Sequence, residues 1–210
     1  MVPLVFASTL AVAALPASFQ RTTVATGLTE PTVIKFTPDG RLLIGERGGR
    51  VRVVQGGTLL PLPLIQLPDI DTRGGERGLV GMALDPAFAS NGWLYLYYTT
   101  GEPRNRVGRF TVVGNAADPA SEVVVWQNPA LAAEWHHGGS LAFGSDGTLF
   151  IATGDQFNSA NSRNLANQQW QDPADHRYGR HPPRQPLRGR AGRPASHLGL
   201  GAAKPLPHRA

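Results

Sequence analysis

Turns followed by apolar, β-rich runs recur at three places along the chain. The three segments are FTPDGRLLIGE from Phe36, FASNGWLYLYY from Phe88 and FGSDGTLFIAT from Phe143. Their turns hold the dipeptides Asp39-Gly40, Asn91-Gly92 and Asp146-Gly147. Such dipeptides supply the positive φ angles of tight turns, and β-branched and aromatic runs after them predict strands. Helical periodicity is absent, so the pattern predicts an all-β protein.

The spacing of the turns indicates an architecture. Asp39 and Asn91 lie 52 residues apart, and Asn91 and Asp146 lie 55 residues apart. Repeats of roughly 40 to 50 residues made of short strands are typical of β-propeller blades, although a β-sandwich with similar turns is an alternative. At this spacing, residues 21–169 can hold about three blades. Propellers close with about four to eight blades, so the pattern predicts a partial β-propeller. Its open edges and half-exposed core would need a second chain or a missing half to cover them.

The first 18 residues, MVPLVFASTLAVAALPAS, form an apolar run of signal-peptide length that ends in small residues. The run lacks the Lys or Arg that normally precedes the apolar core, which a start codon assigned too late would explain. An N-terminal strand or a lipid-facing anchor helix is the alternative to a signal peptide. No membrane span is expected after it, and the chain has no cysteine. We predict a signal peptide over residues 1–18 and a periplasmic or secreted protein.

The net charge of +5 is concentrated at the C-terminal end. Residues 170–210 contain eight Lys and Arg but two Asp and Glu, which leaves a net charge near −1 for the rest of the chain. This tail has neither strand nor helix periodicity and predicts disorder. A basic tail could bind nucleic acid or an acidic polymer, but apart from Tyr178 it lacks aromatic residues for base stacking beyond Trp170. We therefore expect no nucleic-acid partner.

Two adjacent histidines, His136 and His137, are the candidates for chemistry. A zinc site needs three or four ligands at workable spacing, and the neighbouring Glu134 and Asp155 do not form an HExxH-like pattern. No metal residue is therefore assigned. The residues alone leave a catalytic pair and a polar loop open.

Three stretches, taken together and in order, resemble a known family. They are GLTEPTVIKFTPDGRLLIGERGGRVRVV, GGERGLVGMALDPAFASNGWLYLYYT and HHGGSLAFGSDGTLFIATGD. They resemble the N-terminal half of the soluble quinoprotein sugar dehydrogenases of the glucose/sorbosone dehydrogenase family. The resemblance implies a six-bladed β-propeller, of which residues 19–169 are a part. It also implies pyrroloquinoline quinone (PQQ) and calcium as cofactors, an aldose oxidised at its anomeric carbon as substrate, and an electron acceptor.

The resemblance also assigns two site residues. The family's general base is a histidine in a His-x-Gly-Gly-like loop, and His136 takes that place, with His137 as a neighbouring loop residue. Histidine suits this role because it titrates near neutral pH. Gly138 and Gly139 would let the backbone pass close to a flat cofactor. Glu76, in GGERGLVG, matches a polar position that faces the substrate pocket, where the best-known members carry Gln.

Two acidic residues keep a plainer interpretation. Glu76 is alternatively an exposed carboxylate paired with Arg73 or Arg77. Asp155 ends a predicted strand near the same face and is interpreted as a turn or capping residue.

The chain departs from the family after NSRNLANQQ. The family continues with a strand of the kind Gly-Lys-Ile-Leu-Arg-Ile, a Pro-Asp-Asn-Pro-Phe loop and later a Leu-Arg-Asn-Pro-Phe segment, and none of these occurs here. Codons that encode residues 170–189 can be chosen so that a reading one base later gives the first two segments. Codons for residues 197–209 give the third in the same way. We therefore interpret residues 170–210 as a frameshifted reading entered near Gln168 to Trp170.

This interpretation bears on function. By the resemblance, the calcium ligands and the cationic clamp of the cofactor belong to the missing half, so no cofactor-binding residue is assigned. We expect the chain as it stands to be truncated and inactive. The alternative is a non-catalytic propeller-like binding module, because fold alone does not dictate chemistry.

Overall fold

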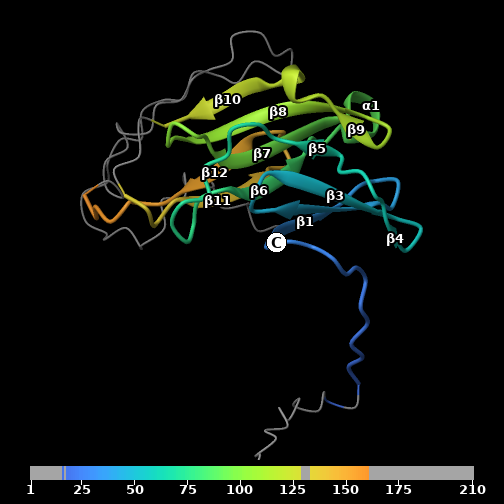
Figure 1. Ribbon diagram of the computed structural model, residues 1–210. Helices are drawn as coiled ribbons and strands as arrows, with labels where there is room; N and C mark the ends of the chain where they lie inside the picture. The colour runs from blue at the N-terminus through green and yellow to red at the C-terminus, as the bar shows by residue number, and fades with distance from the viewer. Residues whose placement is uncertain (1–15, 17, 129–132, 161–210) are drawn as a thin grey trace, which may run out of the picture.

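The computed structural model describes residues 16, 18–128 and 133–160, and the regular secondary structure of these residues is almost entirely β-strand (Figure 1). The predicted tail (170–210) and all but two residues of the predicted signal peptide (1–18) lie outside the described residues. Within the described part of the chain, no helix is long and apolar enough to cross a membrane.

The first sheet is an antiparallel meander. Its order is β1 (Pro31–Phe36), β2 (Leu42–Glu46), β3 (Arg50–Gln55) and β4 (Thr58–Leu59), and β5 (Ile65–Gln66) pairs with the other end of β3. Every residue of β2 is buried. β2 lies between β1 and β3 in its sheet. Its burial shows that both faces of the strand are covered, which agrees with its mostly apolar sequence.

The second sheet repeats this arrangement, and a third begins after it. The second consists of β6 (Leu79–Leu84), β7 (Trp93–Thr99), β8 (Asn105–Val113) and β10 (Val123–Gln127), with β9 (Ala116–Ala117) paired to β8 and a 3₁₀ helix at Pro119–Ser121. The third is a hairpin of β11 (Gly138–Phe143) and β12 (Leu149–Thr153). Among the described residues the sheets do not close on themselves, as predicted for about three blades.

The repeated turns occupy the same place in each sheet. Each dipeptide joins the first two strands: Asp39-Gly40 lies between β1 and β2, Asn91-Gly92 before β7, and Asp146-Gly147 between β11 and β12. The three glycines have positive φ angles of 85°, 65° and 80°. The three similar segments are therefore equivalent structural units, and the predicted repeat is confirmed.

Among the described residues, one short α-helix accompanies the predicted all-β fold. The single turn α1 (Phe88–Asn91) lies between β6 and β7. The carboxylate of Asp85 accepts hydrogen bonds from the backbone N–H of Ala87 and from the amide of Asn91, both at 2.9 Å, and Gly92 ends the helix in the left-handed conformation. A helix of four residues is too short to show an apolar periodicity.

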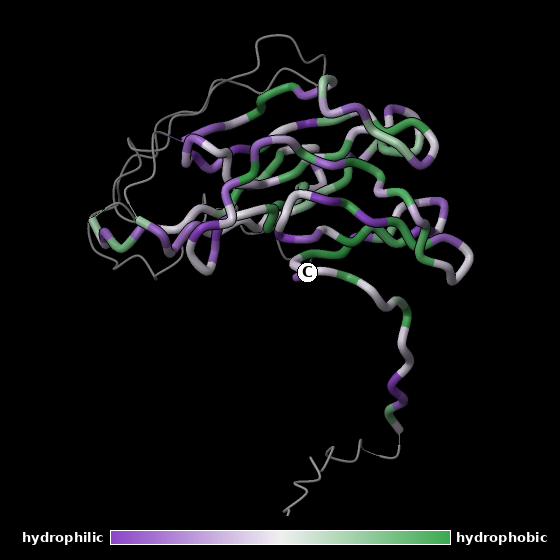
Figure 2. The backbone as a smooth tube through the Cα atoms, viewed as in Figure 1, coloured by the Kyte–Doolittle hydropathy of each residue, from purple (hydrophilic) through white to green (hydrophobic). Residues whose placement is uncertain are grey.

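The sheets pack face to face, with β1 and β11 both against β6. Apolar segments gather along the strands between the sheets (Figure 2). The larger core cluster contains Leu43, Val51 and Val53 from the first sheet and Leu79, Met82, Leu94 and Leu96 from the second. A smaller one joins Tyr97 and Trp126 to Leu141 of β11. Gly81 brings β6 close to β11, because a Cβ there would overlap the carbonyl oxygen of Gly139. This close approach fixes the position of the first residues of β11 against β6, and the two histidines directly precede these residues.

Candidate functional site

The backbone of His136 is held between two other segments. Its N–H donates to Oε2 of Glu76 at 2.5 Å, and its carbonyl oxygen accepts from the N–H of Gln156 at 3.2 Å. Gly154 lies so close to that carbonyl that a Cβ would overlap it. His136 itself has a φ of 61°, which is uncommon for a residue other than glycine. The loops before β6 and after β12 therefore hold His136 in a conformation it would seldom adopt alone.

The imidazole of His136 is oriented by Asp155 and Phe157. Nδ1 lies 2.8 Å from Oδ1 of Asp155, and the ring stacks on the ring of Phe157 with centroids 4.0 Å apart and planes 21° apart. A carboxylate on Nδ1 favours the tautomer with the proton on Nδ1 and leaves Nε2 as the basic nitrogen. The side chain is 47% exposed, so a substrate can reach it. This arrangement can accept a proton at Nε2 and stabilise the resulting cation.

Glu76 differs from its plainer interpretation. Arg73 and Arg77 do not pair with it but with Asp71, at 2.9 and 2.8 Å, so that alternative is wrong. The carboxylate of Glu76 instead accepts backbone N–H groups through Oε2, from His136 and, at 3.2 Å, from His137. Both arginines form ion pairs with Asp71, whose carboxylate is buried. Burial alone would raise the pKa of this carboxyl, but the arginines hold the pKa below its usual value. The predicted contact of Glu76 with substrate stays a prediction.

Asp155 does more than the sequence indicated. As predicted, it forms a turn, because its Oδ1 accepts the N–H of Phe157 at 3.1 Å. The same oxygen faces Nδ1 of His136, which sequence reasoning missed. The sequence does contain a signal for this contact. Asp155 lies two residues beyond Thr153, and Thr153 pairs with Gly138, which directly follows the histidines.

His137 lies inside the protein, beside the exposed His136. Its side chain is 1% exposed, Nδ1 lies 3.3 Å from Nδ2 of Asn105, and Nε2 has no hydrogen-bond partner. Burial lowers the pKa of His137, and the backbone carbonyl of Glu134 opposes this effect. A buried, neutral histidine fits the prediction that His137 is not the base, and it shows His137 to be a packed residue rather than a polar loop residue.

The two glycines after the histidines pack tightly against the protein itself, and the expected approach of a cofactor to their backbone stays a prediction. A Cβ on Gly138 would lie 2.6 Å from the carbonyl oxygen of Ala152, and one on Gly139 would lie 2.6 Å from Cγ2 of Val80. Both glycines also have positive φ angles, 75° and 127°. They are needed for close packing of β11 on its neighbours, so the space they leave is filled by the protein itself.

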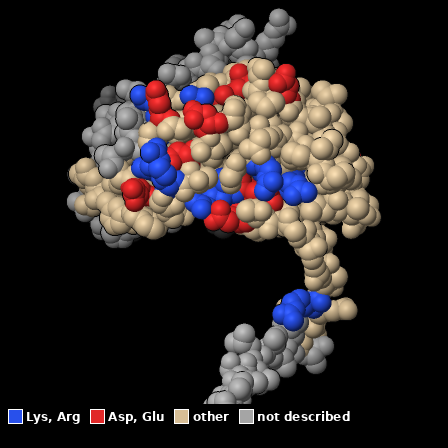
Figure 3. All heavy atoms as spheres, viewed as in Figure 1, with Lys and Arg blue, Asp and Glu red and all other residues tan. Residues whose placement is uncertain are grey.

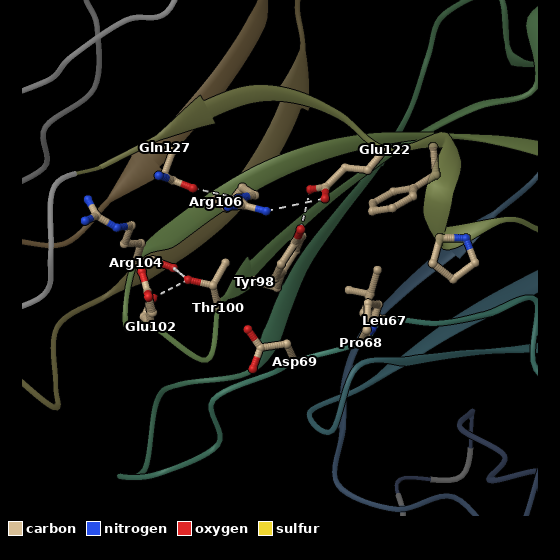
Figure 4. A pocket seen from close by; sticks show the side chains of 12 residues that line it. Leu67, Pro68, Asp69, Tyr98, Thr100, Glu102, Arg104, Arg106, Glu122 and Gln127 are labelled. Carbon is tan, nitrogen blue, oxygen red and sulfur yellow. Dashed lines mark hydrogen bonds and ion pairs between the residues drawn. The ribbon is translucent and has the colours of Figure 1, made fainter.

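A separate cavity is lined by side chains of the second sheet and of the loops beside it (Figure 4). This cavity of about 290 Å³ is lined by residues between Leu67 and Gln127 and by neither histidine. Several of its polar groups already bind one another: Arg106 contacts Gln127 at 2.7 Å and Glu122 at 3.4 Å, and the hydroxyl of Tyr98 donates to Glu122. It is therefore distinct from the site around His136.

The charges around the sheets are mixed in sign. On the face that Figure 3 shows, Lys and Arg side chains lie beside Asp and Glu side chains. Within the described residues, no group of three or more His, Asp or Glu side chains is arranged to hold a metal ion. The calcium ligands that the resemblance places in the missing half stay a prediction. Phe157, whose ring stacks on that of His136, is 65% exposed, and Trp135 is 42% exposed.

Comparison with known proteins gives the family. The sequence model of the Glucose / Sorbosone dehydrogenase family matches residues 28–196, and the chain belongs to this family. It is 34% identical to an aldose sugar dehydrogenase of Escherichia coli strain K12 over an alignment of 161 residues, with coverage of 74% of this chain and 43% of that protein.

Two further relatives differ in what their names describe. The PQQ-bound form of an aldose sugar dehydrogenase from Streptomyces coelicolor is similar in structure, with a TM-score of 0.60, 30% identity, and coverage of 70% of this chain and 44% of that one. Hedgehog-interacting protein of Mus musculus is 33% identical over an alignment of 152 residues, with coverage of 63% of this chain and 21% of that protein. The chain spans less than half the length of each of these relatives. Its fold is all-β and corresponds to part of a β-propeller, as predicted.

Proposed function

We propose that this chain is the base-carrying part of a PQQ-dependent dehydrogenase that oxidises an aldose at its anomeric carbon. The observation that carries this is the contact of 2.8 Å between His136 Nδ1 and Asp155 Oδ1, next to a half-exposed imidazole. Family membership and the PQQ-bound relative support it.

His136 would act as the general base. Oxidation at the anomeric carbon removes a proton from the hydroxyl and a hydride from the carbon, so the hydroxyl becomes a carbonyl. Nε2 of His136 takes the proton, and Asp155 stabilises the imidazolium that forms. Oε2 of Glu76 is occupied by two backbone N–H groups, which leaves Oε1 to accept a hydrogen bond from a second substrate hydroxyl.

PQQ, when bound, would supply the acceptor for the hydride and later pass the electrons to an external acceptor. Phe157, which stacks on His136, and Trp135, the residue before it, expose aromatic surface that such a ring system could contact. Calcium is proposed from the family, and its ligands would belong to the missing half.

The chain as it stands would be inactive. We propose that residues 170–210 are read out of frame, so the residues that clamp the cofactor in the family are missing. A base contributes only about 10² to 10⁴ in rate and requires substrate and acceptor in place. The family match extends to residue 196, which is 27 residues past Gln169, and therefore does not support a boundary at Gln169. Sequencing the gene at this position tests the boundary directly. We also propose export through residues 1–18 to the periplasm or medium.

A binding module is the second candidate. The similarity to a protein named hedgehog-interacting protein favours it, since that name describes binding rather than catalysis.

The deciding experiment uses a frame-restored protein, with one base corrected near Gln169, beside the original chain. Both are assayed with aldose, PQQ, calcium and a dye acceptor. Activity of the restored protein alone supports the proposal. No activity in a folded restored protein that binds no PQQ would favour the binding module.

A further inference from the structure

The carbonyl group of His137 is held by two residues of the second sheet. The hydroxyl of Tyr97, on β7, donates to it at 2.7 Å, and Nδ2 of Asn105, at the start of β8, donates at 3.4 Å. Tyr97 is fully buried, and Asn105 and His137 are each 1% exposed. Because none of these groups can turn to water instead, breaking the contacts would leave buried polar groups unpaired.

Asn105 is itself fixed in one orientation. Its Oδ1 accepts from the hydroxyl of Thr99 at 3.1 Å, and its backbone N–H donates to Oδ1 of Asn128 at 2.8 Å. The amide nitrogen must then face His137, where it lies 3.3 Å from Nδ1. A donor at Nδ1 makes that nitrogen an acceptor and leaves the proton of the neutral ring on Nε2.

The same dipeptide is held from the opposite direction by Glu76. Its carboxylate accepts the N–H groups of both His136 and His137. His136 also has a positive φ, and such strain persists in a non-glycine residue only where the surroundings determine it. The strained peptide is thus fixed on its N–H side by one loop and on its carbonyl side by two strands.

We propose that Tyr97 and Asn105 are positioning residues for His136. By holding the carbonyl of His137, they keep the imidazole of His136 against Asp155 with Nε2 outward. The catalytic meaning of this role rests on the proposed function, but the positioning itself does not. All the residues involved lie between Glu76 and Phe157, so the base is already positioned in the 210-residue chain.

The test compares two tyrosines of one strand in the 210-residue chain. Tyr97→Phe removes the hydroxyl that binds His137, whereas Tyr95→Phe removes one that binds Asp85 at 3.3 Å. Both variants keep the ring. Nuclear magnetic resonance then measures the amide exchange rates of His136 and His137 and the Nδ1 resonance of His136. If the Tyr97 hydroxyl only stabilised the fold, its loss would change amide exchange evenly over the whole chain and would leave the Nδ1 resonance of His136 in place.

Tyr97→Phe is expected to speed exchange of these two amides about tenfold and to shift the Nδ1 resonance, as the loss of one buried hydrogen bond predicts. Tyr95→Phe should change neither. Equal effects of the two variants, or no effect of Tyr97→Phe, would overturn the proposal. If Tyr97→Phe does not fold, Asn105→Ser gives the same comparison, because serine keeps a hydroxyl for Thr99 but cannot reach His137. Since no activity is measured, the proposed function can fail while this inference holds, and the reverse.

Discussion

Oδ1 of Asp155 lies 2.8 Å from Nδ1 of His136, and this contact joins the turn after β12 to the loop before β11. The two residues are 19 positions apart, and the hairpin between them brings them together. The contact determines which ring nitrogen is available as a base, so it links the fold of the third sheet to the proposed chemistry.

Replacing Asp155 should impair catalysis more than binding. In the frame-restored protein, Asp155→Asn is expected to lower kcat by about 10² to 10⁴, because the imidazolium loses its carboxylate and the tautomer is no longer fixed. KM for the aldose should change little. Asp146→Asn makes the same change in the turn before β12 and serves as control. An Asp155→Asn enzyme with the rate of the control would contradict the role given to Asp155.

His137 should make stability depend on pH. Its pKa is lowered in the folded state, so below about pH 6.5, the ordinary histidine value, the unfolded chain binds more protons than the folded one. The free energy of unfolding should therefore fall as pH falls from about 6.5 toward the folded pKa, by at most about 1.4 kcal/mol per pH unit.

Chemical denaturation at several pH values measures this dependence. His137→Gln, which does not titrate, should have lower stability at neutral pH but a shallower slope in this range. If both proteins show the same slope below pH 6.5, burial of His137 is not what makes the fold sensitive to acid.

Close approach of β6 and β11 makes Gly81 difficult to replace. Gly81→Ala places a Cβ on the carbonyl oxygen of Gly139, and relief of this overlap is expected to cost about 1–3 kcal/mol. Gly48→Ala is a matched control, because no atom lies within 4 Å of its added Cβ, and its effect should stay within about 0.5 kcal/mol. The midpoints of thermal unfolding of the two variants measure this difference in stability. Equal midpoints would mean that the two sheets do not pack as described.

The repeats could be predicted because their signals are local. Asp39-Gly40 and Asp146-Gly147 are turn dipeptides followed by strand-forming runs, and each joins the first two strands of its sheet. His136 was found by resemblance to a family, since two adjacent histidines alone left several interpretations open.

The remainder of the site depends on contacts that the sequence does not display. In the sequence, Tyr97 resembles the other residues of its β-rich run. Its hydroxyl nevertheless contacts the carbonyl of His137, a residue 40 positions away. The bond from Glu76 to the backbone of His136 spans 60 positions and requires a positive φ at a histidine, which no local pattern indicates. Such contacts follow from how the sheets pack, and neither turn chemistry nor periodicity specifies them.

The central claim is that His136 is the base of a sugar dehydrogenase of which this chain carries one part. The most direct measurement is the rate of aldose oxidation, with PQQ, calcium and a dye acceptor, by the frame-restored protein and by its His136→Ala variant. The account predicts activity in the restored protein and a loss of about 10² to 10⁴ in kcat on His136→Ala, with the fold retained. Full activity in the His136→Ala variant would contradict it.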